Sequence, residues 1–252
     1  MRNILAIAHR GDSAHAPENT LAAFRAALDA GADMVECDVG LTRDLVPVIL
    51  HDADLDRTSD GRGKLSAHSY DEMARLDAGS WFGPAFAGER IPTLEQALDL
   101  LAGRVQVNVE VKPEVLEQVS PERAAALVLD PVRRRGLLGS VVFSSFSAGV
   151  LDALRAAEPA ARLGALADRP QAPEAAAARV RELAAESFNP DEAHLTPELA
   201  AAVHAAGALV LPWARRGRNT ASAMRRALSL GADGFFADDP ALLRRVAAGF
   251  RS

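Results

Sequence analysis

The chain has 252 residues, 49% of them hydrophobic and 25% charged, which is typical of a folded globular protein and excludes an intrinsically disordered one. Its formal net charge of -6 argues against nucleic acid as a partner, because duplex-binding proteins usually present a basic face. A single cysteine excludes an intramolecular disulfide, and the first apolar stretch is too short for a signal peptide or a membrane span. We therefore expect a cytoplasmic protein without stable membrane association.

Short runs rich in β-branched residues alternate with Ala-, Leu- and Arg-rich helical patterns along the chain. The predicted strands are Ile4–His9, Met34–Val39, Val46–His51, Val105–Val111, Val141–Ser145, Arg162–Leu166, Glu186–Asn189, Ala208–Pro212 and Gly234–Ala237. The predicted helices are Thr20–Ala30, Thr93–Leu101, Pro121–Arg134, Ala148–Ala157, Ala172–Ala185, Thr196–Ala206, Thr220–Leu230 and Pro240–Phe250, the first capped by Asn19 or Thr20. This α/β alternation predicts a single (β/α)8 TIM-type barrel over residues 1–252 rather than a doubly wound sheet.

The segment from about residue 52 to 90 breaks this alternation and is rich in Asp, Gly and Ser. It follows the predicted strand ending near His51, so we expect a small insertion over the carboxyl-terminal face of the barrel. One helix is expected within it, at Ser69–Leu76. Its aromatic residues, Trp81 and Phe82 among them, indicate a packed cap rather than a wandering surface loop.

Several of the apolar strands carry ionisable residues at their ends. Because strand side chains alternate between faces, Glu36 and Asp38 share one face, and Glu110 and Lys112 share one face of another strand. Three carboxylates buried without a counter-ion would be very costly, and all-oxygen ligands suit Mg²⁺ or Ca²⁺. The pattern predicts a divalent-cation site on Glu36, Asp38 and Glu110; the alternative is that these carboxylates simply pair with Arg10 and Lys112.

Two histidines, His9 and His51, end predicted strands at the same face, where they could act as general acid and general base near neutral pH. Lysine is rare in this chain, which uses it only at positions 64 and 112. A compact ammonium at Lys112, assisted by Arg10, is suited to neutralising a phosphate.

A series of short motifs extends over nearly the whole chain. They are His9-Arg10-Gly11, Pro17-Glu18-Asn19-Thr20, Glu36-Cys37-Asp38-Val39, His51-Asp52, Leu55-Asp56-Arg57-Thr58, Ile91-Pro92-Thr93-Leu94-Glu95, Asn108-Val109-Glu110-Val111-Lys112 and Asp238-Asp239-Pro240. Together they resemble the glycerophosphodiester phosphodiesterase family. Each motif alone is weak evidence, whereas their joint spacing is highly specific.

The resemblance implies metal-dependent hydrolysis of glycerophosphodiesters to glycerol 3-phosphate and an alcohol. It implies a divalent cation (Mg²⁺, Ca²⁺ or Mn²⁺) on the three carboxylates, with His9 and His51 as the acid–base pair and Arg10 and Lys112 on the phosphate. Attack by the glycerol 2-hydroxyl, giving a cyclic phosphate, and direct attack by water both stay open, as do the preferred alcohol and the oligomeric state.

The resemblance also implies further contacts with a small-molecule substrate. Glu18 is expected to anchor its loop or contact the metal-bound group, and Trp213 to line the pocket. Trp81 and Phe82 of the insertion are expected to help Trp213 form an apolar wall against the glycerol.

Two other functions fit a barrel of this kind. A non-catalytic phosphodiester sensor would not need both His9 and His51, so the presence of both favours an enzyme. A phospholipase D-like lipase would need an exposed apolar surface on the insertion, whose Asp and Arg content favours a soluble substrate.

Overall fold

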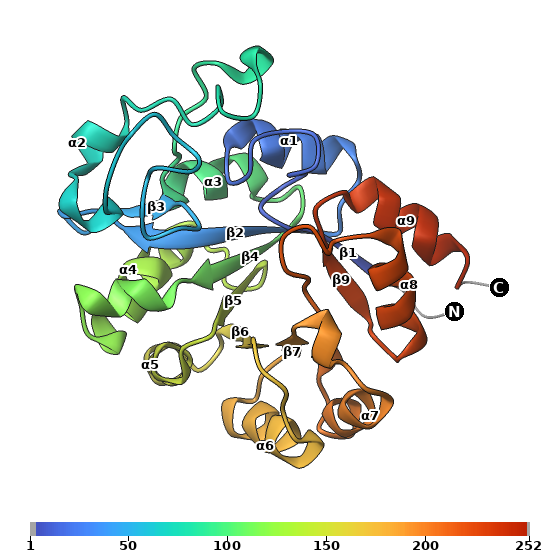
Figure 1. Ribbon diagram of the computed structural model, residues 1–252. Helices are drawn as coiled ribbons and strands as arrows, with labels where there is room; N and C mark the ends of the chain where they lie inside the picture. Colours follow the sequence, from blue (N-terminus) through green and yellow to red (C-terminus); the bar gives the residue numbers. More distant parts are fainter. Residues whose placement is uncertain (1–3, 251–252) are drawn as a thin grey trace.

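The computed structural model describes residues 4–250, in which helices surround a barrel of parallel strands (Figure 1). The barrel strands are β1 (Leu5–Ala8), β2 (Met34–Leu41), β4 (Gln106–Val111), β5 (Val141–Ser145), β6 (Arg162–Ala167), β7 (Ser187–Pro190), β8 (Leu209–Val210) and β9 (Gly234–Ala237). They pair in the order β8-β7-β6-β5-β4-β2-β1-β9. Trp213, just beyond β8, pairs in parallel with Phe236 of β9 and brings the two ends of this order together. The predicted TIM-type barrel is confirmed.

The helices around the barrel agree closely with the predicted ranges. They are α1 (Leu21–Asp29), α3 (Leu94–Leu101), α4 (Pro121–Arg134), α5 (Ala148–Ala157), α6 (Pro173–Leu183), α7 (Pro197–Ala205), α8 (Ala221–Ser229) and α9 (Pro240–Ala248). The short 3₁₀ helices η1 (Leu65–Ala67), η2 (Pro84–Phe86), η3 (Pro113–Glu117) and η4 (Glu192–His194) were not predicted. No helix within residues 4–250 combines the length and apolar character needed to cross a lipid bilayer.

One predicted strand has a different role. β3 (Pro47–Ile49) pairs antiparallel with β2, with Val39 opposite Ile49, and lies outside the barrel order. The turn between the two strands includes Leu45 at a φ of 61°, a left-handed conformation that reverses the chain. A short apolar run does not distinguish a parallel barrel strand from a hairpin strand. The prediction that His51 ends a barrel strand was therefore wrong, because His51 follows the returning arm of a hairpin.

The insertion after β3 packs around a small core that is separate from that of the barrel and to which Val48 of β3 also belongs. α2 (Tyr70–Met73) is shorter than the predicted helix, and its Ser69 and Glu72 form a capping box. Trp81, Phe82 and Phe86 do pack together, with ring centroids 5.6 and 5.4 Å apart in edge-to-face pairs. The buried residues of this core are Val48, Leu50, Leu55, Leu65, Met73, Ala78 and Ile91.

The barrel interior is apolar towards the amino-terminal ends of the strands and polar at its mouth, where the carboxyl-terminal ends of the strands lie. Ile7, Met34, Val142, Leu211 and Phe236 form the interior cluster. The alternating valines of β4 are buried in the separate core that contacts the helices. Asn108 and Glu110, which alternate with these valines on β4, therefore face the interior, as the alternation predicted.

Candidate active site

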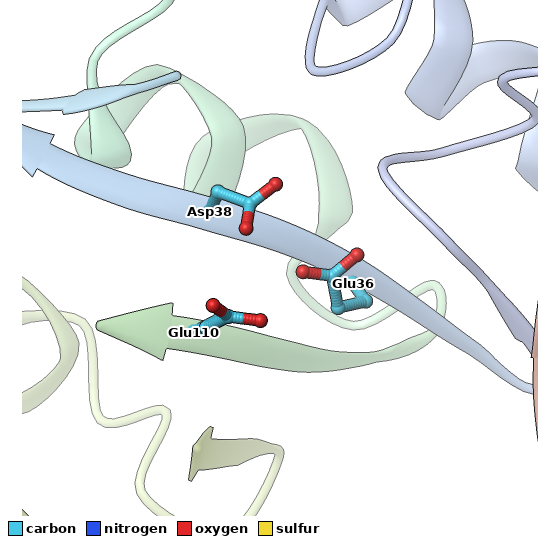
Figure 2. Close-up of side chains that lie close together, drawn as sticks. All are labelled: Glu36, Asp38 and Glu110. Atoms are coloured by element: carbon cyan, nitrogen blue, oxygen red, sulfur yellow. The ribbon is translucent and has the colours of Figure 1, made fainter. Parts of the chain in front are cut away.

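Three carboxylates face one another at the mouth of the barrel (Figure 2). Glu36 and Asp38 lie on β2 and Glu110 lies on β4, where the strand register pairs Asp38 with Glu110. One oxygen of each residue lies within 4.8 Å of those of the other two, and all three residues are buried. The structure thus brings together the residues that the sequence predicted as metal ligands.

Two cations and one backbone amide contact these carboxylates. Lys112 Nζ lies 2.8 Å from Glu110 Oε1 and 3.4 Å from Asp38 Oδ1, and Arg10 Nε lies 3.2 Å from Asp38 Oδ2. The backbone N–H of Arg10 donates to Glu36 Oε2 at 2.7 Å. Within residues 4–250, the buried Oε1 of Glu36 has no hydrogen-bond partner. The alternative of simple ion pairing therefore accounts for only part of the cluster.

The turn after β1 explains how Arg10 reaches this position. Arg10 adopts a φ of 58° and the next residue, Gly11, a φ of 80°, both in the left-handed region. A Cβ atom at Gly11 would lie 2.6 Å from the backbone carbonyl carbon of Ala23 in α1. Only glycine therefore allows the turn to pack against α1 while the Arg10 amide points at Glu36.

The electrostatics of the cluster favour an additional cation. Burial and the charges of Asp38 and Glu110 raise the pKa of Glu36 well above its usual range, and burial and Asp38 raise the pKa of Glu110. Burial opposes ionisation of Asp38 too, but the charges of Lys112 and Arg10 hold its pKa well below its usual range. Three buried carboxylates, an unpartnered oxygen and an all-oxygen donor set fit a hard divalent cation.

Each of the two predicted acid–base histidines is held by a carboxylate. His9 Nδ1 lies 2.7 Å from Asp238 Oδ1, and His51 Nδ1 lies 2.6 Å from Asp52 Oδ1. A carboxylate on Nδ1 fixes the ring and leaves Nε2 for chemistry. The cavity of about 90 Å³ at the barrel mouth is lined by His9, Arg10, Glu36, His51, Glu110, Lys112, Phe146, Leu166, Trp213 and Phe236.

Comparison with known proteins identifies the family. The profile described as "Glycerophosphoryl diester phosphodiesterase family" matches residues 9–242. The chain belongs to this family. A glycerophosphodiester phosphodiesterase of Caldanaerobacter subterraneus subsp. tengcongensis is 35% identical over 95% of this chain and 96% of its own length.

Solved structures of phosphodiesterases share the whole fold. One from Oleispira antarctica, in complex with the product sn-glycerol-3-phosphate, has a TM-score of 0.86 at 32% identity and covers 96% of each chain. A glycerophosphodiester phosphodiesterase from Agrobacterium tumefaciens has a TM-score of 0.79 at 31% identity, covering 97% of this chain and 100% of its own. The predicted family and enzyme class, a phosphoric diester hydrolase, are confirmed.

In this phosphodiesterase, Glu18 lies beside the cluster rather than within it. It accepts hydrogen bonds from Arg10 Nη1 at 2.8 Å and from Arg57 Nη1 and Nη2 at 2.7 and 2.8 Å. Burial would raise the pKa of Glu18, but the Arg57 hydrogen bonds and the charges of Arg10 and Arg57 lower it to about 2. These hydrogen bonds connect the Glu18 loop to Arg57 of the insertion, and a contact between Glu18 and a metal-bound group stays a prediction.

Glu18→Gln is expected to make the free energy of unfolding less dependent on pH in the acid range. Folding lowers the pKa of Glu18 from 4.5, so its ionised form stabilises the fold above that pH and the contribution is lost as the pH falls towards 2. Urea unfolding of the metal-free protein between these pH values measures the difference. Glu114→Gln, at an exposed position, is the control, and parallel pH curves for wild type and Glu18→Gln would contradict the expectation.

The aromatic residues that were predicted to form one wall of the pocket lie in two separate parts of the structure. Trp213 lines the cavity and packs edge-to-face against Phe146, with ring centroids 5.6 Å apart. Trp81 and Phe82 instead pack within the insertion and are not among the residues that line this cavity. Phe146 had no predicted role, although it lies in a position directly after β5.

Sequence reasoning gave no role in the site to four polar residues that support it, Asn19, Asp52, Arg57 and Asp238; Asn19 was predicted only as a possible cap of the first helix. Asn19 donates from Nδ2 to Asp38 Oδ2 at 2.8 Å, while Thr20 caps α1. Asp52 and Asp238 hold the two histidines, and Arg57 contacts Glu18 and Asp52. These residues belong to the motifs that resemble the family, but the motifs alone did not predict which residues they contact.

Proposed function

We propose that this enzyme hydrolyses glycerophosphodiesters to glycerol 3-phosphate and an alcohol, with a divalent cation held by Glu36, Asp38 and Glu110. The main support is the cluster of three buried carboxylates, two of which, Glu36 and Glu110, line the same cavity as the two carboxylate-held histidines. The complex of the Oleispira antarctica relative with sn-glycerol-3-phosphate supports the same product here. The cytoplasmic location and the absence of a nucleic-acid partner stay predictions.

Positive charge binds the phosphodiester. Arg10 and Lys112 line the cavity beside the acidic cluster, where they can contact the anionic phosphoryl oxygens. Preorganised charges of this kind stabilise the negative charge that develops during attack, because they need not reorient as the reaction proceeds. When bound, the divalent cation supplies Lewis-acid stabilisation of the phosphoryl oxygens.

His9 and His51 carry the protons. One imidazole takes the proton from the attacking hydroxyl as the new O–P bond forms, and the other gives a proton to the alcohol oxygen as the old P–O bond breaks. Asp238 and Asp52 keep the two rings oriented and stabilise each one when protonated. The same pair serves direct attack by water, or attack by the glycerol 2-hydroxyl followed by attack of water on the cyclic phosphate, which opens it to glycerol 3-phosphate. Trp213 provides an apolar side to the cavity.

The test is the release of glycerol 3-phosphate from glycerophosphocholine, glycerophosphoethanolamine and glycerophosphoinositol. We expect release with Mg²⁺, Ca²⁺ or Mn²⁺, loss of release on chelation, and recovery when the cation is restored. Phosphorus NMR during the reaction distinguishes the routes, since only 2-hydroxyl attack produces a cyclic glycerol phosphate. Full activity in the presence of EDTA would contradict the proposed function.

A further inference from the structure

The insertion places one guanidinium beside the barrel mouth. Arg57 lies in a turn where the neighbouring Leu55, Thr58 and Ser59 are buried. Ser59 Oγ donates to the Leu55 carbonyl at 2.8 Å, and Leu55 belongs to the insertion's core. The backbone that carries Arg57 is therefore fixed by the folding of the insertion.

Arg57 bridges two carboxylates that come from different parts of the chain. Its Nε and Nη2 lie 2.5 and 3.1 Å from the Asp52 oxygens, and its Nη1 and Nη2 lie 2.7 and 2.8 Å from the Glu18 oxygens. These contacts use most of the N–H groups of a planar fork. A lysine ammonium at this position could not bind both carboxylates in the same way.

Each of these carboxylates also holds a residue of the proposed reaction. Asp52 Oδ1 lies 2.6 Å from His51 Nδ1, and Glu18 Oε1 accepts from Arg10 Nη1 at 2.8 Å. His51 and Arg10 line the cavity, whereas Arg57 is not among the lining residues. A continuous series of hydrogen bonds thus connects the insertion to both a proton-transfer residue and a phosphate-binding residue.

We propose that Arg57 is a positioning residue that orients His51 through Asp52 and Arg10 through Glu18 at the same time. The inference rests on the proposed function, because it uses the roles given there to His51 and Arg10. Loss of Arg57 releases two constraints with different kinetic consequences. A less constrained His51 lowers kcat, and a less constrained Arg10 weakens phosphate binding and raises KM.

Arg57→Ala is expected to lower kcat by about 10- to 100-fold, the usual effect of removing a group that supports a catalytic residue, and to raise KM several-fold. The matched control is Arg62→Ala, since the Arg62 side chain is 75% exposed and, among residues 4–250, its polar contacts are with Asp56 and nearby backbone carbonyls. Activity of Arg62→Ala should stay close to that of the wild type. Circular dichroism and thermal unfolding of each variant verify that the barrel is folded.

Two further measurements separate positioning from a general structural role. Guanidinium at non-denaturing concentration should restore part of the kcat of Arg57→Ala, whereas sodium chloride at the same concentration should not, and Arg57→Lys should recover little. In double-mutant cycles, Arg57→Ala should be non-additive with Asp52→Asn in kcat and with Glu18→Gln in KM. A merely destabilised insertion would show neither guanidinium rescue nor this division between kcat and KM.

The same kinetics distinguish failure of this inference from failure of the proposed function. Suppose that His51→Ala is inactive but Arg57→Ala has normal kcat and KM, or that the double-mutant cycles are additive. Either result would overturn the role of Arg57 and leave the proposed function intact. Full activity in His51→Ala would overturn the proposed function, whatever Arg57→Ala shows. A folded Arg57→Ala that loses activity without guanidinium rescue, and without coupling to Asp52 and Glu18, would also overturn the positioning role.

Discussion

His9→Ala and His51→Ala are each expected to lower kcat for glycerol 3-phosphate release by about 10²- to 10⁴-fold, the usual contribution of a general acid or base. Neither residue contacts the carboxylate cluster through an ion pair. Cation binding, measured by calorimetry, should therefore persist in both variants. His15→Ala is the control, because the side chain of His15 is 61% exposed and its Nδ1 pairs with Asp12, outside the carboxylate cluster.

The choice of leaving group reveals which histidine is the acid. A p-nitrophenyl phosphodiester releases p-nitrophenolate, which is stable without a proton, so the variant that lacks the acid should regain much of its rate on this substrate. The variant that lacks the base should not, because its defect lies in activating the nucleophile. Equal losses on both substrates in both variants would contradict a division of labour between His9 and His51.

Alternation along strands predicted the centre of the site. Glu36 and Asp38 are two residues apart on β2, and the pleat of the strand places them on one face, opposite Asn108 and Glu110 of β4. Lys112 follows β4 directly and contacts Asp38 and Glu110. The number of strand–helix units then predicted that the two strands belong to one barrel, where the carboxyl ends of parallel strands share one rim. Local periodicity and fold class were therefore sufficient to predict that the three carboxylates lie together.

The residues that orient the histidines could not be predicted in this way. Asp238 is 229 positions from His9 in the sequence, and only closure of the barrel through β9 and β1 brings the two together. His51 reaches the site by a hairpin whose apolar return strand looked like a barrel strand. Contacts of this kind depend on tertiary structure, which no single stretch of sequence encodes.

Removal of the acidic cluster is expected to have the second large effect. Glu36→Gln, Asp38→Asn and Glu110→Gln should each weaken divalent-cation binding and lower activity by at least about 100-fold, because an amide brings one neutral oxygen where a carboxylate brings a charged one. Calorimetric titration with Mg²⁺, Ca²⁺ and Mn²⁺ measures the binding. Glu114→Gln, at an exposed position on η3, is the matched control and should bind and react like the wild type.

In the absence of a cation, Glu36→Gln is expected to be more stable than the wild type at neutral pH. The pKa of Glu36 is raised by burial and by its acidic neighbours, so the folded protein binds a proton more tightly than the unfolded chain does. The stability of the wild type should therefore fall as the pH rises from the unfolded value of this carboxyl towards its raised folded value. A glutamine does not ionise, so the variant avoids this loss.

A bound cation should reverse the sign of this pH dependence. It binds the ionised carboxylates, so protons leave Glu36 and Glu110 as it enters, and its affinity should increase with pH. Thermal unfolding at several pH values, with and without Mn²⁺, should show stabilisation by the cation that grows with pH in the wild type and is much smaller in Glu36→Gln. Stabilisation that is independent of pH, or equal in the two proteins, would mean that the cation binds away from Glu36, and the proposed ligand set would then be wrong.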